Sequence, residues 1–396
     1  MEVYLDNAAT TKLNEEAFSV MQKVFFSDYG NPSSLHIKGV DASAYLREAR
    51  RIISEDLKCA EKEIVFTSGG TESNNTALFG TAHAKRRKGM HIISSAYEHA
   101  SVYNPLIALE EEGFKVDYVK PDANGIVDPK SVAELVNNET ILVSIMAVNN
   151  EIGAVNDIGA ISKAVKEVNP DVTVHVDAIQ AYPKYRIIPK KEGIDLMSVS
   201  SHKFGGPKGV GFLYIKDKTR INPLILGGGQ QKGMRSGTDN VPGIAGMAEA
   251  LKVYAENRKE YVDKMYALKE HFAQALLKVE GIKLNAVFEN LSDEKSLGER
   301  IRMTAPHVLS VSFPNVRSEV MLHALEMKGI CCSSGSACSS NHPAISGTLQ
   351  AIGVEGKYLD TTLRFSLSPD NTQEEIDYTV EAIKELLPVY LNFYRK

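Results

Sequence analysis

The sequence has few of the features that mark secreted, membrane or nucleic-acid-binding proteins. Only four cysteines occur in 396 residues, which is not a disulfide framework. No stretch approaches the roughly 18 to 20 uncharged apolar residues that are needed to span a bilayer. The first residues show no basic segment followed by an apolar run, so no signal peptide is predicted. We therefore expect a soluble protein of the cytoplasm.

The charge balance also lacks a strong excess of either sign. A formal net charge of -5 gives no electrostatic reason to expect nucleic acid or an anionic membrane as a direct ligand. Apolar residues make up 43% of the chain and charged residues 24%, which is ordinary for a globular protein. The length predicts two domains, or one large α/β domain with an appendage.

Short apolar runs alternate with helical patterns over the first two thirds of the chain. The run ILVSIMAV at 141–148 has no period-two alternation, which indicates a strand buried on both faces, as in a parallel sheet covered by helices. Helical spacing and capping residues occur at 128–136 and 158–168. This order predicts an α/β sheet of parallel character. Strands are expected at 64–67, 91–94, 141–148, 172–176, 196–199 and 209–215.

The last third predicts a second, smaller α+β domain. Residues 241–279 have a continuous helical pattern, which we interpret as two helices with a break. Residues 308–313 and 363–367 alternate in the manner of half-buried strands.

A polar turn follows the strand that is expected at 196–199. Residues 200–209 read SSHKFGGPKG, so Lys203 emerges at the carboxyl end of that strand, where open α/β sheets bind ligands. A lysine flanked by hydroxyls and a histidine suits an imine with an aldehyde cofactor, together with contacts to a phosphate. Taken alone, the pattern fits a surface lysine in a Gly/Pro turn equally well.

Two further segments suit the same cofactor. Asp177 and Gln180 follow an apolar strand, and a carboxylate beside a pyridine nitrogen keeps that nitrogen protonated and makes the ring an electron sink. Gln180 could donate to a ring hydroxyl oxygen, whereas the alternative for Asp177 is a helix cap. The glycine turn FTSGGTESNN at 66–75 joins a strand to a helix start and forms an anion cradle. Its spacing matches neither the P-loop nor the dinucleotide fingerprint, which favours a phosphate monoester.

Together these segments resemble the cysteine desulfurase family, in the class V branch of the fold-type I pyridoxal phosphate enzymes. The resemblance covers nearly the whole chain. It implies a mainly parallel central sheet covered by helices, a smaller α+β domain, and pyridoxal 5'-phosphate as cofactor. We expect the large domain at 15–255 and the small domain at 1–14 and 256–396. Further matching segments are YLDNAATT at 4–11, GNPSSLH at 30–36, EH at 98–99, NNEIG at 149–153, GMRSGT at 233–238, SSGSAC at 333–338 and RFSL at 364–367.

The resemblance implies a role for each matching position around the cofactor. Lys203 would hold the aldehyde and later move the Cα proton of the substrate. His99 would stack on the ring and act as acid or base, since an ordinary histidine pKa near ~6.5 suits both roles. Asp177 would pair with the pyridine nitrogen and Gln180 with the ring oxygen. The residues implied to hold the phosphate are Gly70, Thr71, Ser200, His202 and Thr238.

Two of these implications concern partners. In the family, a threonine matching Thr238 reaches the phosphate across a dimer interface, so a homodimer is implied. Asn150 and Arg364 would hold the carboxylate of the substrate, L-cysteine, next to the cofactor. Arg364 would do so through a bidentate fork that lysine could not replace.

Cys338 is the residue that separates a desulfurase from an aminotransferase. It lies in a predicted flexible loop, at about 331–346, that is crowded with Ser, Gly, Asn and Pro. In the family, the matching thiolate attacks the sulfur of cysteine, carries it as a persulfide and releases alanine. The sulfur would pass to an acceptor for iron–sulfur cluster assembly, thio-cofactor synthesis or tRNA thiolation. The alternative is an incidental exposed cysteine.

The remaining cysteines carry weaker predictions. Cys331 and Cys332 end an apolar segment, where small buried cysteines are common packing residues. A relay from Cys338, or a metal site shared with it, is the alternative, although the spacing does not identify a zinc site. Cys59 is expected to be structural. No resident metal is expected, and Cys338 is at most a transient iron–sulfur ligand.

One departure from the family pattern bears on the sulfur acceptor. After Cys338 the chain reads SSNHPAISG, where family members of the housekeeping iron–sulfur type often continue with an acidic stretch. The departure leaves the acceptor open. The competing functions are a selenocysteine lyase, another class V enzyme such as an aminotransferase, and a scaffold that has lost its chemistry.

Overall fold

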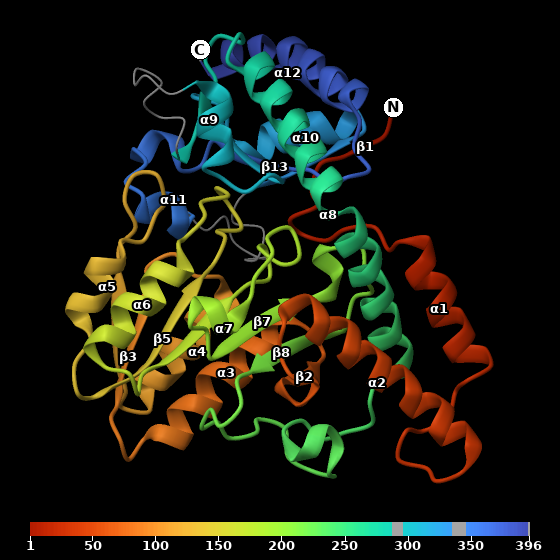
Figure 1. The fold of residues 1–396 in the computed structure, drawn as a ribbon. Coiled ribbons are helices and arrows are strands. Elements are labelled where there is room, and N and C mark those ends of the chain that lie inside the picture. The colour runs from red at the N-terminus through yellow and green to blue at the C-terminus, as the bar shows by residue number, and fades with distance from the viewer. Residues whose placement is uncertain (287–295, 335–345, 395–396) are drawn as a thin grey trace.

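The chain forms a seven-stranded sheet and a smaller four-stranded sheet, each flanked by helices (Figure 1). The structure, a computed structural model, describes residues 1–286, 296–334 and 346–394. Adjacent strands from β7 to β4 are parallel, whereas β8 is antiparallel to both β2 and β7. The mainly parallel sheet predicted from the sequence is therefore confirmed. The strand order is β2 (Ile64–Thr67), β8 (Gly211–Ile215), β7 (Leu196–Ser200), β6 (Thr173–Asp177), β5 (Thr140–Met146), β3 (His91–Ser95) and β4 (Lys115–Val119).

Helices connect these strands and cover the sheet. Most begin at a side chain that accepts a backbone N–H in the first turn, such as Asp128 before α5 and Asp157 before α6. The helices associated with the large sheet are α1 (Glu15–Phe26), α2 (Ile37–Leu57), α3 (Gly70–Lys85), α4 (Ala100–Glu111), α5 (Pro129–Leu135), α6 (Ile158–Val168) and α7 (Pro189–Glu192), with the 3-10 turns η1 (Glu61–Glu63), η2 (Ser201–Lys203) and η3 (Gln230–Gly233).

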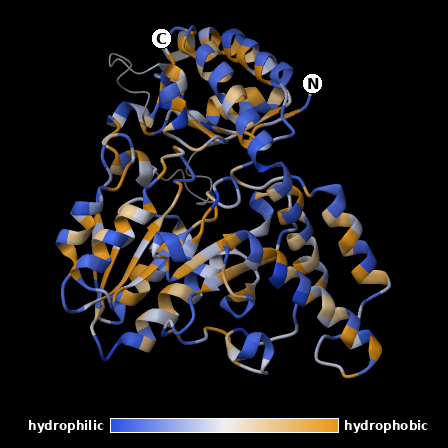
Figure 2. Cartoon of the chain, viewed as in Figure 1, coloured by the Kyte–Doolittle hydropathy of each residue, from blue (hydrophilic) through white to orange (hydrophobic). Residues whose placement is uncertain are grey.

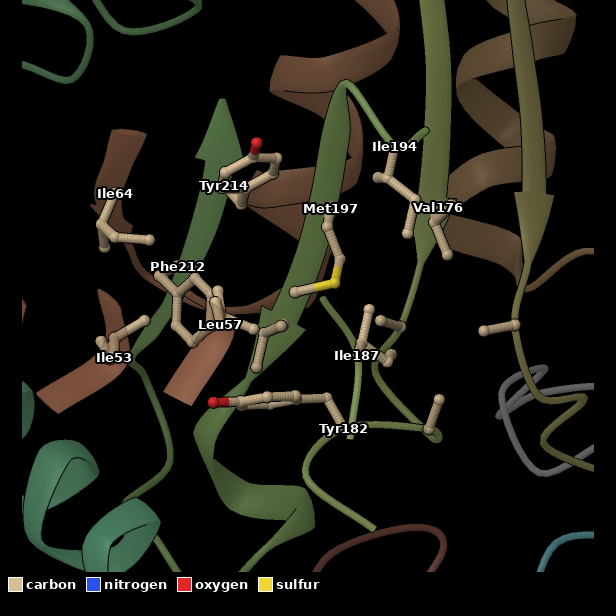
Figure 3. Close-up of a cluster of buried hydrophobic side chains, with 14 of the residues drawn as sticks. Ile53, Leu57, Ile64, Val176, Tyr182, Ile187, Ile194, Met197, Phe212 and Tyr214 are labelled. Carbon is tan, nitrogen blue, oxygen red and sulfur yellow. The ribbon is translucent and has the colours of Figure 1, made fainter. Parts of the chain in front are cut away.

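The large sheet is buried on both faces. Every residue of β5, β6 and β7 is buried, which explains why the run at 141–148 shows no alternation. On β7, Leu196 belongs to a cluster with Ala77 of α3, whereas the next residue, Met197, belongs to a cluster with Leu57 of α2 (Figure 3). Successive strand residues point to opposite faces, so α2 and α3 cover opposite faces. The cluster labelled in Figure 3 contains Ile53, Leu57, Ile64, Val176, Tyr182, Ile187, Ile194, Met197, Phe212 and Tyr214.

Helix α8 (Val241–Leu276) corrects one prediction. It is a single helix of 36 residues, where we expected two helices with a break. After Gly246 its sequence contains neither glycine nor proline, so nothing interrupts the backbone. The helix changes its packing partner instead: buried residues occur up to Tyr254, where α1 and α2 pack, and again from Met265, with none between them. The domain boundary at 255/256 falls in this unburied stretch and stays a prediction.

The small sheet corrects another prediction. All residues of β10 and β13 are buried, although their sequences suggested half-buried strands. One face packs on the helices above it in Figure 1, and the other face lies toward the large sheet. Its antiparallel order is β12 (Ser333–Ser334), β13 (Thr362–Ser366), β10 (Val308–Ser312) and β9 (Lys283–Leu284). The helices here are α9 (Leu297–Arg302), α10 (Ser318–Met327), α11 (Gly347–Ala351) and α12 (Gln373–Tyr394), with the 3-10 turn η5 (Gly356–Tyr358).

The N-terminal segment joins the two parts. β1 (Val3–Tyr4) pairs in parallel with β11 (Ile330–Cys331), so both chain ends lie at the small sheet (Figure 1). β11 and β12 occupy residues on either side of Cys332, so residues 331, 333 and 334 of the predicted loop belong to strands. Residues 335–345, which include Cys338, lie outside the described residues.

Apolar and polar residues alternate along the outer helices, whereas the strands of the large sheet are mainly hydrophobic (Figure 2). Across the described ranges, none of the helices combines the length and the apolar character that crossing a membrane requires.

Candidate active site

The predicted site residues gather at one edge of the large sheet. Asp177 and Ser200 end β6 and β7, and Asn150 and His99 follow β5 and β3. These four strands are mutually parallel, so their carboxyl ends meet at the same edge. This edge faces the small sheet.

Lys203 lies in η2, directly after β7. Its Nζ donates to the carbonyl oxygens of Ala8 at 2.6 Å and Ala9 at 2.7 Å. The N-terminal segment therefore passes over the lysine and orients its amine. The backbone carbonyl of Lys203 accepts from Lys184, whose pKa burial lowers to about 7, with the Lys203 charge acting in the same direction.

Asp177 is buried, with both carboxylate oxygens held by donors. Oδ2 accepts from Asn74 Nδ2 at 2.8 Å, and Oδ1 accepts from the backbone N–H of Ile179 at 2.9 Å. Two donors in a dry environment fix the orientation of the carboxylate. A carboxylate fixed in this way can pair with a protonated pyridine nitrogen.

His99 is connected to Asp177 through a chain of side chains. Its Nδ1 lies 2.8 Å from Ser101 Oγ and accepts from the backbone N–H of Ser101 at 3.1 Å. Ser101 Oγ in turn accepts from Asn74 Nδ2 at 2.9 Å, the same amide that holds Asp177. Because Nδ1 is an acceptor, a neutral His99 carries its proton on Nε2.

The glycine turn and Ser200 lie together, as an anion cradle requires. A Cβ at Gly70 would meet Ile179 Cδ1 at 2.2 Å and Ser200 Cβ at 3.5 Å, so the first turn of α3 approaches both β6 and β7 closely. Gly69 has φ +146°, a conformation that other residues rarely adopt. Thr71, next in the turn, is exposed.

The other two predicted phosphate residues differ in their surroundings. His202 Nδ1 lies 3.2 Å from Thr10 Oγ1, and burial lowers the pKa of His202 to about 4, with Lys203 and Lys208 contributing. Thr238 is exposed, three residues after Arg235, which pairs with Glu72 of α3.

Arg364 and Asn150 are brought together from the two sheets. Arg364, on β13, donates from Nη1 to the backbone carbonyl of Asn150 at 3.0 Å and from Nη2 to Asp6 Oδ1 at 2.8 Å. Its guanidinium is buried, and its Nε has no hydrogen-bond partner among the described residues. A buried guanidinium with an unused donor is suited to hold a carboxylate.

Two buried carboxyls flank this region. Glu98 accepts from Ser95 Oγ and from the backbone N–H of Met146, and burial raises its pKa to about 8. Glu151 accepts from Ser346 and Thr348, and burial raises its pKa as well. Glu151 thereby joins the Asn150 turn to the start of α11.

The described cysteines divide into exposed and buried positions. Cys331 is exposed, which corrects the expectation of a buried packing residue, because β11 turns this side chain away from the core. Cys332 packs against the small-sheet core, and burial raises its pKa to about 12. Burial also raises the pKa of Cys59 to about 12, as suits a structural thiol. No trio of His, Cys, Asp or Glu within the described ranges is arranged to hold a metal.

A cavity of about 490 Å³ lies behind Lys203, between the N-terminal segment and α8. Its lining includes Lys184, Tyr254 and His307, but none of Asp177, His99 or Arg364. Among these site residues only Lys203 lines the cavity, so the cavity reaches the site from the side of the N-terminal segment.

Several residues of the site were not assigned from the sequence. Asn74 and Asp6 lie in segments that the resemblance quoted, yet their contacts with Asp177 and Arg364 appear only in three dimensions. Ser101 follows the EH pair by two residues, and a Ser at that distance from a helix-capping histidine is the one signal that could have indicated it. The carbonyl of Ala8 has no side-chain signature at all.

These residues fit pyridoxal 5'-phosphate. The edge offers an amine, a fixed carboxylate, a helix N-terminus beside hydroxyls, and a buried guanidinium, which match the aldehyde, the pyridine nitrogen, the phosphate and a substrate carboxylate. The Gly70 position has no room for a Cβ beside Ile179, so the backbone itself forms the cradle.

Comparison with known proteins agrees with this chemistry. The family model for class-V aminotransferases matches residues 3–379. Cysteine desulfurase IscS of Dictyoglomus turgidum is 39% identical over 386 residues, covering 98% of this chain and 94% of the relative. The Methanosarcina thermophila protein of the same name is 38% identical and covers 97% and 92%.

Solved structures give the same family. A NifS-like protein superposes with a TM-score of 0.90 at 36% identity, covering 98% of this chain and 100% of that one. A structure described as SspA in complex with cysteine has a TM-score of 0.78 at 31% identity and covers 94% and 100%. The chain belongs to the class-V aminotransferase family, among its pyridoxal-phosphate-dependent cysteine desulfurases.

Proposed function

We propose that this enzyme removes sulfur from L-cysteine, releases L-alanine and retains the sulfur as a persulfide on Cys338. The observation that carries the proposal is the convergence of Lys203, Asp177 and Arg364 at one sheet edge. Cys338 contributes through its place in the sequence. One solved relative is described in complex with cysteine, which supports the substrate.

Pyridoxal phosphate, when bound, supplies an electron sink that makes the substrate Cα–H acidic. Asp177 holds the pyridine nitrogen protonated, and Asn74 and Ile179 hold Asp177. Lys203 carries the Cα proton, since its amine is already oriented by two carbonyls from the N-terminal segment. Arg364 and Asn150 hold the carboxylate and so keep the Cα–H in reach of Lys203.

The sulfur step needs one thiolate and one proton. The Cys338 thiolate bonds to the substrate sulfur while the Cβ–S bond breaks, and the electron pair of that bond stays with carbon. A proton then completes the methyl group of alanine, so no outside oxidant or reductant is required. His99, whose Nδ1 accepts from Ser101 and whose proton is therefore on Nε2 when it is neutral, would serve as the proton donor.

Isotope labelling tests the proposal directly. The enzyme is incubated with sulfur-labelled L-cysteine, and the peptide that carries Cys338 is analysed by mass spectrometry. We expect a labelled persulfide on Cys338, and the matched variant Cys59→Ser should give the same adduct. Absence of any sulfur adduct on that peptide would refute the sulfur role of Cys338.

The variant Cys338→Ser separates the alternatives. An aminotransferase needs no thiol at this position, so amino-group transfer would persist in the variant. Our proposal predicts that alanine and sulfide production from cysteine stop while the cofactor stays bound. A selenocysteine lyase would release selenide from selenocysteine and little sulfide from cysteine. Assays of the wild-type protein with both substrates distinguish this activity from the proposed one.

We also propose a homodimer that works in the cytoplasm and passes sulfur to an iron–sulfur scaffold, a tRNA-thiolation enzyme or a thio-cofactor pathway. Thr238 is exposed, and several large apolar side chains of α1 and α2 are exposed as well, including Phe18, Phe26 and Ile37. A second copy would cover such a surface. Sedimentation of the holoenzyme tests this, and a monomer at micromolar concentration would contradict it.

A further inference from the structure

His307 is a buried histidine that the proposed reaction does not use. It directly precedes β10 and is 1% exposed. Its Nε2 lies 2.9 Å from Oε1 of Gln180, the residue expected at the ring oxygen of the cofactor. The imidazole therefore lies behind Gln180, on the side of the small sheet.

The direction of this hydrogen bond follows from the second contact of Gln180. Gln180 Nε2 donates to the Ala8 carbonyl at 2.9 Å. If the amide were turned over, two carbonyl oxygens would face each other at that distance without a proton between them. Oε1 must therefore face His307, and His307 must donate from Nε2.

The surroundings keep His307 neutral. Burial lowers its pKa well below the ordinary value, and the charges of Lys184, Lys269, Arg364 and Lys203 act in the same direction. Its Nδ1 has no hydrogen-bond partner in the part of the chain that the structure describes. A neutral imidazole with its single N–H on Nε2 is a donor of fixed direction.

The same carbonyl also connects Gln180 with the cofactor lysine. Ala8 O accepts from both Gln180 Nε2 and Lys203 Nζ, which lies at 2.6 Å. The amide nitrogen of Gln180 therefore lies next to Lys203. Its second N–H makes no hydrogen bond within the part of the chain that the structure describes, and it can serve a ligand there.

We propose that His307 is a positioning residue that, together with the Ala8 carbonyl, holds the Gln180 amide so that its N–H, and not its carbonyl, faces the ring oxygen of the cofactor. The inference rests on the proposed place of Gln180 at the cofactor. A purely structural His307 would instead only fill the space beneath β10 and accept from the backbone N–H of Leu367 through its own carbonyl.

The visible absorption of the bound cofactor measures this orientation. An N–H that points at the ring oxygen stabilises the more negative, deprotonated form, and so lowers the pH at which the band changes. In His307→Phe the Gln180 oxygen loses its buried donor, and the Ala8 carbonyl alone holds the amide. We expect that midpoint to rise by about 0.5 to 1 pH unit, the size of one neutral hydrogen bond.

A rescue variant and a double mutant separate this role from a structural one. His307→Gln restores a donor at the same reach, so its midpoint should return toward the wild-type value. In the Gln180→Ala background, His307→Phe should cause no further shift. An equal shift in that background, or no shift in His307→Phe despite a wild-type unfolding temperature, would overturn the proposal.

The experiment stays informative if the proposed function fails. The absorption titration needs only bound cofactor, whereas the desulfurase proposal is tested by alanine and persulfide formation. Even in a protein that binds the cofactor but forms no persulfide, the absorption midpoint can be measured. Its response to His307→Phe, with and without Gln180, still tests the positioning role. His323→Phe, a change at an exposed histidine on α10, serves as a matched control without a shift.

Discussion

Replacing Asp177 by asparagine tests how the site holds its cofactor. The carboxylate accepts from Asn74 Nδ2 and from the backbone N–H of Ile179, so both oxygens already face donors. An asparagine at this position must turn an NH2 group toward one of these donors. Asn74 cannot simply turn over in response, because its amide also holds Ser101 Oγ.

The magnitude follows from the number of interactions lost. One charge-assisted hydrogen bond is worth about 1.5 to 3 kcal/mol in such a setting. The dissociation constant for pyridoxal phosphate should therefore rise about 10- to 100-fold, since 1.4 kcal/mol corresponds to tenfold. Turnover at saturating cofactor should fall further, because a neutral amide does not keep the pyridine nitrogen protonated.

The assay combines a cofactor titration by visible absorbance with alanine formation from cysteine. Asp171→Asn is the matched control, since the side chain of Asp171 is 77% exposed and should change neither quantity. Wild-type cofactor affinity together with wild-type turnover in Asp177→Asn would refute the reasoning about this carboxylate.

Two further predictions concern the substrate side and pH. Arg364→Lys should raise KM for cysteine about 10- to 100-fold with a smaller change in kcat, because one ammonium cannot serve Asp6, Asn150 and a carboxylate together; a fall in kcat alone would contradict this. Glu98, with its pKa raised to about 8, holds a proton in the folded state that the unfolded chain releases near pH ~4.3. Stability should thus fall as pH rises from about 4 to about 8. Glu98→Gln should remove this fall. If the unfolding temperature of the variant depends on pH in the same way as that of the wild-type protein, the prediction is contradicted.

The sequence predicted the parts of the fold that depend on local pattern. Six of the strands of the large sheet, β2, β3, β5, β6, β7 and β8, lie within two residues of their expected bounds, because apolar runs between turn residues mark buried strands. β4 was missed because its sequence, KVDYV, contains two charged residues and is not an apolar run. The strand lies at the edge of the sheet, where part of it stays exposed to solvent. The unbroken α8 was missed because its packing partner, and not its backbone, changes along its length.

The site was predictable to the extent that its chemistry is carried by side chains at strand ends. Lys203, Asp177 and Ser200 each follow an apolar run, and their strands are parallel neighbours. The pairing of Arg364 with Asp6, and of Lys203 with Ala8, was not predictable, because it depends on how two sheets and a terminal segment meet. Backbone carbonyls leave no mark in a sequence.

The path of the N-terminal segment has a consequence for the order of synthesis. Residues that leave the ribosome first provide the carbonyls that orient Lys203, yet Asp6 finds its partner Arg364 only 358 residues later. The segment must wait for β13 before its final position is fixed, since such distant contacts close late. The large sheet can thus form early during translation, while the ability to capture the cofactor productively appears only when almost the entire chain has been made.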